Sequence, residues 1–330
     1  MENFDIIAIG DTTTDAFIRL KDASVNCDIN REHCMLSLRF GDKVPYEFVE
    51  IVRAVGNSAN AAVAGARLGL KTALVGNIGD DDNGKECLAS LQSSGVSTNF
   101  ISTQAGKHTN YHYVLWYEDE RTILIKHESF AYTLPDVGSP RWMYLSSMGE
   151  EASPLYDIIP PYLDAHPETQ LAFQPGTYQM KLGTERLAGI YTHTDIFFCN
   201  TDEARRILKR EDLDIKVLLK GIRELGPKMV IITDGVKGAY AYHESDMWYM
   251  SSYPDPKPPY ERTGAGDAFS STIVSALAMG KTIDEALRWA PINSMSVVQK
   301  IGAQAGLLTV SEIEHYLLQA PADYTPKKIS

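Results

Sequence analysis

The chain has 330 residues, of which 44% are apolar and 22% are charged, and its formal net charge is -12 at pH 7. This composition is ordinary for a folded globular protein, and the length suits one large α/β domain or two small ones. The acidic balance argues against nucleic-acid and membrane partners. Because no apolar run reaches transmembrane length and the first residues lack a signal-peptide pattern, we expect a cytoplasmic protein.

The first predicted element is a buried strand from Phe4 to Ile9, which ends at Gly10. The polar residues 11–15 follow as a loop at the carboxyl end of this strand, where open α/β sheets bind ligands. Asp15 is a candidate ligand for two neighbouring hydroxyl groups of a polyol, because an ionised carboxylate accepts hydrogen bonds through two oxygens. The alternative is that Asp15 is a capping aspartate in a solvated turn and binds no ligand.

Two segments show the alternating apolar and polar pattern of β-strands. The first covers residues 16 to about 52, and the second runs from Tyr111 to Lys126. We interpret them as one small sheet that stands off the main layer and covers a ligand, meets a partner subunit or does both. Cys27 and Cys34 belong to the first segment and are close enough in sequence to cross-link locally, but in a reducing cytosol we expect both to be free thiols.

The segment from Val55 to Gly69 is rich in alanine and glycine, which suits a helix packed closely against a sheet. Asn57 or Ser58 is the predicted N-cap, so Asn60 lies in the first turn. The Asn60 amide can donate to and accept from a sugar hydroxyl group, and a second capping contact is the alternative.

From Thr72 onward, strand and helix patterns alternate, which indicates a mainly parallel sheet with helices on both faces. Within this part, a helix begins near Asn200, and Glu203 in its first turn can reach water bound to a magnesium ion or simply complete the cap. Thr233 then follows another strand. Its hydroxyl group and the bare backbone of Gly235 and Gly238 suit a phosphate tail, or the turn is an ordinary hairpin.

Small residues precede a helical pattern in the segment from Thr263 to Phe269. They let backbone N–H groups approach an anion, and the positive end of the helix faces the same place. Asp267 adds a carboxylate in the first turn. This arrangement is typical of a site that moves a phosphoryl group, although a glycine-rich turn with an aspartate at a helix start is the plain alternative.

These signals occur in the order of the ribokinase family, also called PfkB carbohydrate kinases, and the resemblance spans the chain from Gly10 to Gly306. The segment 263–269 resembles the family signature D-T-x-G-A-G-D-A-F, and the segment 56–69 resembles G-G-x-x-x-N-x-A. The resemblance implies a single domain over residues 1–330, a three-layer α/β/α sandwich with a mainly parallel central sheet. It also implies a small β-sheet lid formed by about residues 16–52 and 107–130.

The resemblance assigns the reaction and its catalytic residues. Asp267 matches the general base that takes the proton from a hydroxymethyl group, while Gly264, Ala265 and Gly266 match the anion hole for the γ-phosphoryl group. Such roles suit phosphoryl transfer, which depends on positioning and electrostatic stabilisation. We therefore expect an ATP- and magnesium-dependent kinase for the primary hydroxyl group of a sugar or nucleoside.

The remaining site residues are carried over in the same way. Positions facing the sugar are Thr13, Asp15, Gly56, Asn57 and Asn60. Positions facing the nucleotide are Asn200, Thr233, Gly235, Gly238 and, by a weaker match, Asn293. Glu203 matches a position near magnesium. In many relatives the lid also joins subunits, which implies a homodimer.

Three departures from the family pattern qualify these expectations. Glu261 stands where the signature has aspartate, and Arg262 replaces a small residue, so we do not expect activation by a monovalent cation. Arg262 is instead a candidate contact for nucleotide phosphates. Val55 replaces the first glycine of the N-terminal pair. The segment that begins at Gln174, after another predicted strand, resembles the nucleoside-kinase branch of the family more than the sugar-phosphate kinases.

Two other classes of protein fit part of the pattern. A catalytically silent protein of the same fold would bind the sugar or nucleoside without turnover, and the intact Asp267 argues against it. A dinucleotide-dependent oxidoreductase would need G-x-G-x-x-G after the first strand, where this chain has Gly10 followed by polar residues.

Overall fold

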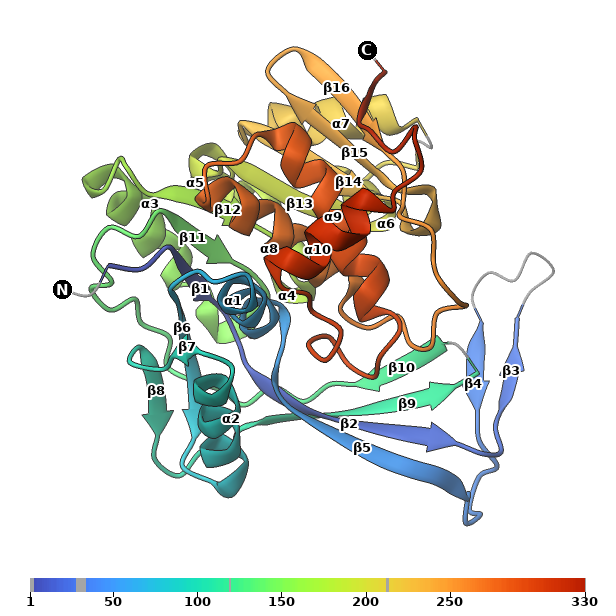
Figure 1. The fold of residues 1–330 in the computed structure, drawn as a ribbon. Coiled ribbons are helices and arrows are strands. Elements are labelled where there is room, and N and C mark those ends of the chain that lie inside the picture. Colours follow the sequence, from blue (N-terminus) through green and yellow to red (C-terminus); the bar gives the residue numbers. More distant parts are fainter. Residues whose placement is uncertain (1–2, 28–33, 119, 212–213, 330) are drawn as a thin grey trace.

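A computed structural model describes residues 3–27, 34–118, 120–211 and 214–329 and is built around an 11-stranded sheet (Figure 1). From edge to edge its strands are β17 (Lys327–Lys328), β16 (Asp246–Met250), β15 (Ala239–His243), β14 (Met229–Thr233), β13 (Ile196–Asn200), β12 (Gln170–Phe173), β11 (Trp142–Leu145), β1 (Ile6–Ile9), β6 (Thr72–Gly79) and β7 (Val96–Ser97), with β8 (Ile101–Gln104) also paired to β6. All neighbouring pairs from β14 to β7 are parallel, and those from β14 to β17 are antiparallel. The predicted mainly parallel sheet is confirmed.

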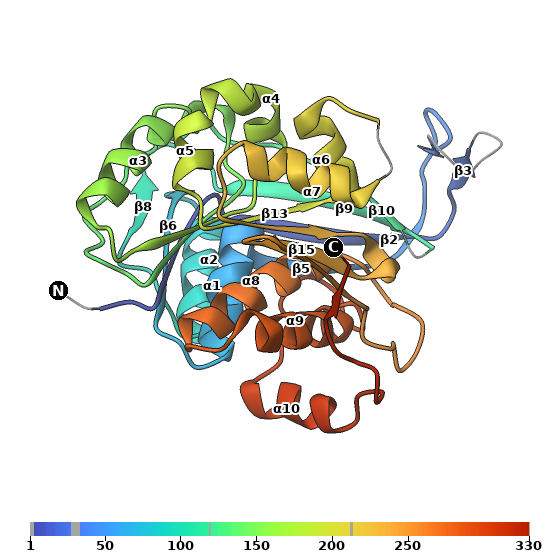
Figure 2. The ribbon, with the colours of Figure 1, turned by 90° about the horizontal axis from the view of Figure 1, so that it is seen from above.

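Helices cover both faces of this sheet (Figure 2). One face carries α1 (Asn57–Arg67), α2 (Asp82–Ser93), α8 (Ala265–Ala278), α9 (Ile283–Val297) and α10 (Val310–Leu318). The other carries α3 (Leu155–Ala165), α4 (Thr177–Arg186), α5 (Ala188–His193), α6 (Thr201–Leu208) and α7 (Ile215–Glu224). Two single-turn 3-10 helices are η1 (Glu150–Ala152) and η2 (Gly235–Lys237).

Side chains from the two faces of the sheet form two separate apolar clusters. Ile6 and Ala8 of β1 belong to the cluster beneath α1, α8 and α9, whereas Ile7 and Ile9 belong to the cluster beneath α3, α5 and α7. This division follows from the alternation of side chains along a strand that is buried on both sides. The three-layer α/β/α architecture predicted from the sequence is therefore confirmed. Among the described helices, none has the length and apolar character needed to cross a membrane.

A second sheet projects from one end of the sandwich (Figure 1). Its order is β10 (Glu120–Leu124), β9 (Asn110–Tyr117), β2 (Thr13–Leu20) and β5 (Tyr46–Val55). These strands come from around the two segments predicted for the lid, of which residues 28–33 and 119 lie outside the described part of the chain. The predicted loop over residues 11–15 is shorter than expected, because Thr13 and Asp15 already pair with both β5 and β9.

A hairpin of β3 (Ser24–Asn26) and β4 (Met35–Ser37) extends beyond the second sheet. Asn26 pairs with Met35, so the next residues, Cys27 and Cys34, lie opposite each other and form a disulfide bond. The prediction of free thiols at these two positions is therefore wrong for this structure. The prediction gave the expected redox environment more weight than a local cross-link, whereas strand register brings the two cysteines together. Cys87 and Cys199 are free and buried.

Candidate active site

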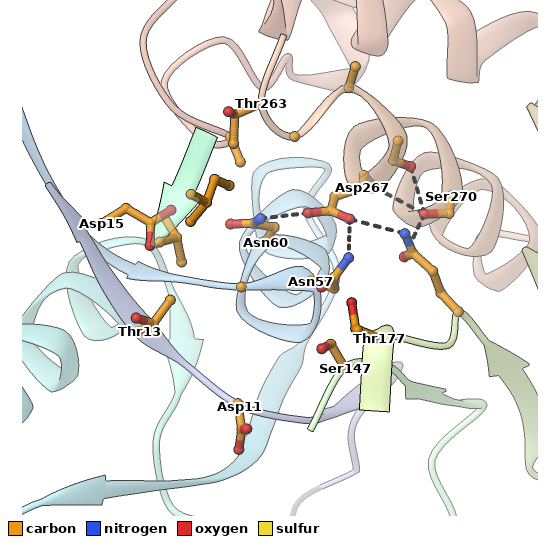
Figure 3. A pocket seen from close by; sticks show the side chains of 18 of the residues that line it. Asp11, Thr13, Asp15, Asn57, Asn60, Ser147, Thr177, Thr263, Asp267 and Ser270 are labelled. Atoms are coloured by element: carbon orange, nitrogen blue, oxygen red, sulfur yellow. Dashed lines mark hydrogen bonds between the residues drawn. The ribbon is translucent and has the colours of Figure 1, made fainter. Parts of the chain in front are cut away.

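A cavity of about 420 Å³ lies where the second sheet meets the sandwich. β2, β9 and β10 contribute to one side of its lining, and the starts of α1 and α8 contribute to the other. In Figure 3, Thr13 and Asp15 on β2 lie apart from Asp267, with the α1 residues Asn57 and Asn60 close to the Asp267 carboxylate. The fold thus gathers candidate residues from both ends of the sequence in one cavity.

Three side-chain amides hold the Asp267 carboxylate. Asn57 Nδ2 donates to Oδ1 over 2.7 Å, Asn60 Nδ2 donates to Oδ2 over 2.8 Å, and Gln174 Nε2 donates to Oδ1 over 3.1 Å. The sequence predicts Asn57 and Asn60 as sugar contacts, and in the structure their nitrogens serve Asp267. These bonds fix both carboxylate oxygens, which is the requirement for a carboxylate that must meet a reacting group in one orientation.

The amides are themselves oriented by further bonds. Tyr144 donates its phenolic proton to Gln174 Oε1, which turns the Gln174 NH₂ group toward Asp267. Gln304 Nε2 donates to Asn60 Oδ1 over 3.0 Å and fixes that amide in the same sense. Because the amide oxygens of Gln174 and Asn60 accept these bonds, the amide nitrogens of the same residues are left to donate to the Asp267 carboxylate.

Opposing effects act on the pKa of Asp267. Burial is the largest, and it raises the pKa above the ordinary aspartate value because it disfavours the charged form. The hydrogen bonds from Asn60, Gln174 and Asn57 act in the opposite direction, and the nearby Arg121 charge adds to them. The net direction is upward, which moves the carboxyl group toward the range in which a general base works efficiently.

Asp267 belongs to the first turn of α8, as predicted. Gly264 is the N-cap of α8 and has a φ of 82°, and an added Cβ there would lie 2.2 Å from Ala303 Cβ. Gly266, by contrast, is exposed and has no atom within 4 Å of an added Cβ. Gly264 thus lets the chain pass close to residue 303 before it enters the helix, and the first N–H groups of α8 are available for an anion.

The N-cap of α1 differs from the prediction. Gly56 is the cap, with a φ of 110°, rather than Asn57 or Ser58. Ser58 Oγ donates to Ile9 O over 2.6 Å, and Asn57 is bound to Asp267, so neither side chain turns back to the helix end. A Cβ on Gly56 would lie 2.7 Å from Asp11 O. Gly56 therefore permits the close approach of α1 to the end of β1.

A second cavity of about 320 Å³ adjoins the first. Thr233, Gly235 and Gly238, the residues predicted to face a nucleotide, line it. Residues that line both cavities are Thr233, Arg262, Ala265, Gly266 and Phe269. The start of α8 is therefore the shared wall, with the Asp267 carboxylate on the side of the first cavity.

Asn200 and Glu203 line the first cavity and form a capping box at the start of α6. Asn200 Oδ1 accepts from Glu203 N over 2.8 Å, and Glu203 Oε2 accepts from Asn200 N over 2.9 Å. Burial raises the pKa of Glu203. No cluster of three or more His, Cys, Asp or Glu side chains in the described residues is suited to a metal ion. The residues present fit a magnesium ion that is carried mainly by phosphate oxygens and water, with the Glu203 carboxylate as a neighbour.

Asn293 is the one predicted site residue that the structure keeps away from both cavities. It is fully buried in α9, where it donates to Thr272 Oγ1 over 2.8 Å and accepts from Leu308 N over 2.9 Å. The Asn293 amide group is therefore hydrogen-bonded within the core. The second cavity is instead lined nearby by Pro291, Ser294 and Met295 of the same helix.

Thr13 and Asp15 of β2 line the first cavity, as do Val55 and Gly56 at the start of α1. The structure adds two histidines from outside the sequence motifs. His112 Nδ1 lies 3.3 Å from Asp15 Oδ1, and His127 Nδ1 lies 3.1 Å from Asp11 Oδ2. Sequence reasoning missed both because no local pattern links a histidine to an aspartate about a hundred residues away. Pairing of β2 with β9 brings His112 opposite Asp15.

Comparison with known proteins places this chain in a family. The model of the pfkB family carbohydrate kinases matches residues 50–310. A nucleoside kinase of Methanothermobacter thermautotrophicus is 27% identical over 272 residues, which are 78% of this chain and 82% of that protein. A ribokinase of Bacillus subtilis is 30% identical over 271 residues, which are 79% of this chain and 87% of that protein.

A solved structure shares the fold. Arabidopsis thaliana ribokinase complexed with ribose and ATP superposes with a TM-score of 0.78 over 96% of this chain and 99% of that chain, at 19% identity. The fold and the family match define a carbohydrate or nucleoside kinase, a phosphotransferase with an alcohol group as acceptor. The chain belongs to the pfkB family of carbohydrate kinases, as its resemblance to the ribokinases implies.

Gly264→Ala tests the geometry of the turn before α8. We expect it to lower the free energy of unfolding by at least about 1 kcal/mol, because a side chain in the left-handed region is strained and the new methyl group overlaps Ala303. Urea unfolding measures the change. Gly266→Ala, where nothing lies within 4 Å of the added Cβ, is the matched control and should not destabilise the fold. Equal losses in the two variants would contradict this explanation.

Proposed function

We propose that the protein is an ATP-dependent kinase that transfers the γ-phosphoryl group to the primary hydroxyl group of a sugar or nucleoside, with Asp267 as the general base. The observation that carries the proposal is the position of Asp267 at the start of α8, beside the wall that the two cavities share. The acceptor occupies the larger cavity, and the nucleotide occupies the smaller one. The whole chain acts as a single kinase domain with the second sheet as its lid.

In the proposed reaction, Asp267 accepts the proton of the acceptor hydroxyl group while the hydroxyl oxygen attacks the γ-phosphorus. The bond between the γ-phosphorus and the bridging oxygen to the β-phosphate breaks, and ADP leaves with the electron pair. Backbone N–H groups at Gly264, Ala265 and Gly266 stabilise the charge on the phosphoryl oxygens. Bound magnesium would neutralise phosphate charge, with Glu203 and Asn200 as its neighbours in the chain.

The acceptor side supports a small polyol. Asp15 and Thr13 offer hydrogen-bonding groups on β2, and Asn57 and Asn60 keep their nitrogens on Asp267. An ionised Asp15 accepts from two hydroxyl groups at once, as on a ribose ring. Water is excluded when the lid sheet closes over the acceptor.

Asp267→Asn tests the role of the base. Purified protein is incubated with MgATP and ribose, fructose, adenosine, inosine or cytidine, and ADP and phosphorylated product are quantified. We expect one or more acceptors to be phosphorylated by the wild type, and Asp267→Asn to lose about 10²–10⁴-fold in kcat, which is the usual contribution of general base catalysis.

Two results would contradict the proposal. If Asp267→Asn unfolds like the wild type and keeps full turnover, Asp267 is not the general base. Calorimetric binding of a sugar or nucleoside without turnover by the wild type would favour the catalytically silent alternative.

The pH dependence of the reaction tests the environment of Asp267. Only the ionised base accepts a proton, so kcat/KM should fall as the pH falls through its raised pKa. Asn60→Ala removes a donor that lowers this pKa, so the acid limb should move to higher pH. Asn77→Ala, which changes a buried asparagine on β6 outside both cavities, is the control. An acid limb that is unmoved or moves to lower pH in Asn60→Ala would contradict the account.

We also propose that the lid joins two copies of the chain. Its outer face, defined as Val49, Ile51, Tyr113 and Leu124, exposes between 40% and 51% of each residue. Ala16 pairs with both Ile51 and Tyr113, and Leu124 pairs with Tyr113, so these side chains share one side of the sheet. The opposite side carries Asp15 and His112 and faces the cavity. A second copy would remove the exposed apolar face from water.

Tyr113→Lys combined with Ile51→Lys should turn a dimer into a monomer, because two charges would be buried in the shared face. Sedimentation velocity over a range of concentrations measures the oligomeric state. The control is Leu318→Lys, which changes an 87% exposed leucine at the end of α10. A wild type that stays monomeric at all concentrations would overturn this part of the proposal.

A further inference from the structure

Two arginines stand at the junction of the two cavities. Arg121 on β10 lines the first cavity, and Arg262 in the loop before α8 lines both. Among the residues that the structure describes, they are the only lysine or arginine side chains in either lining. The first cavity also contains the carboxyl groups of Asp11, Asp15, Glu203 and Asp267. A polyphosphate chain at this junction would therefore find its fixed positive charge only in Arg121 and Arg262.

Each guanidinium group is paired loosely with a carboxylate of the other's segment. Arg121 Nε lies 3.6 Å from Glu261 Oε1, and Arg262 Nε lies 4.0 Å from Glu120 Oε1. The pairs are crossed, since Glu120 precedes Arg121 on the lid and Glu261 precedes Arg262 in the loop. Both Nε atoms are buried and have no hydrogen-bond partner. The two groups therefore retain donor capacity that the protein itself does not use.

Glu261 links this arrangement to the turn before α8. It is 1% exposed, and its Oε1 accepts from Thr263 N over 2.8 Å and from Thr263 Oγ1 over 2.5 Å. The same carboxylate thus holds the residue next to Gly264 and faces the lid arginine. Trp116 on β9 packs edge-to-face on Tyr260 with ring centroids 5.0 Å apart, which adds an apolar contact between the same two segments.

We propose that Arg121 and Arg262 form an arginine clamp that binds the γ-phosphoryl group of the bound nucleotide and holds it through the transfer, with Glu261 as the positioning residue that joins the clamp to the turn at Gly264. This inference rests on the proposed kinase function. The guanidinium groups donate N–H bonds to the non-bridging oxygens and exchange no proton, since arginine stays protonated. Because Arg121 is carried by the lid, the clamp is complete only when the lid sheet lies against the loop.

Nucleotide binding without an acceptor tests the clamp. Calorimetry with MgADP and with the magnesium complex of a non-hydrolysable ATP analogue is done on the wild type, Arg121→Ala and Arg262→Ala. A charge-assisted hydrogen bond contributes about 1.5–3 kcal/mol, so each variant should lose about tenfold or more in affinity for the triphosphate. The loss for MgADP should be clearly smaller, because the diphosphate has no γ-phosphoryl group.

Arg53→Ala is the matched control, because Arg53 is a lid arginine that pairs with Glu86 over 2.6 Å and lines neither cavity. It should bind both nucleotides like the wild type. Glu261→Gln should lower kcat for the acceptor found with the panel while leaving the KM of that acceptor unchanged.

Equal losses for the two nucleotides, or unchanged affinity for both, would overturn the clamp and leave the ion pairs as structural contacts. A wild type that binds the triphosphate but phosphorylates no acceptor would contradict the kinase proposal instead. The two failures are therefore distinguishable.

Discussion

The arrangement of the site depends on one constraint, the cost of reducing the access of water to the Asp267 carboxylate, which belongs to a half-buried residue at the wall of the first cavity. A buried charge must be hydrogen-bonded, and here the donors come from α1 and from the residue after β12. Bringing them to α8 requires the starts of two helices and the end of a strand to converge. The close contacts at Gly56 and Gly264 are the points where the backbone makes this possible.

The same convergence gives the site its electrostatic character. Burial raises the pKa of Asp267, and the amide donors act against it without reversing the upward direction. Amide donors orient the carboxylate without supplying a full positive charge, so its basicity is retained. The full positive charges belong to Arg121 on the lid and Arg262 in the loop before α8, and they lie where these two segments meet. In our account the base and the phosphate-binding groups are thereby kept distinct, and both lie within reach of the junction between the cavities.

The sequence predicts the architecture and the start of α8 well because these features are local. Alternation of strands and helices specifies the layers, and small residues before a helical pattern specify the turn at Gly264. Long-range partners are not visible in this way. Asn60 and Asp267 are 207 positions apart, so the sequence indicates two polar residues without showing that they bond to each other. Gln174 and Arg121 take part only because β12 and β10 deliver them to the same cavity.

The departures from prediction have similar causes. The disulfide of Cys27 and Cys34 follows from hairpin register, which composition does not reveal. Asn293 matches a family position weakly, but the neighbouring Thr272 and the backbone of Leu308 use its amide in the core. Asn57 is a plausible cap by residue type, yet a carboxylate that needs a donor takes its side chain. In each case a tertiary contact overrides a local preference.

We propose that Asp267 is a carboxylate with restricted access to water that is held ready to accept a proton. The most direct test is a pH titration by NMR of protein labelled with ¹³C at the aspartate side-chain carboxyl groups, with Asp267→Asn used to assign the signal. We expect the signal that is absent from the variant to titrate above the ordinary aspartate pKa of about 3.9. A pKa at or below that value would show that the amide donors outweigh burial and would contradict the account.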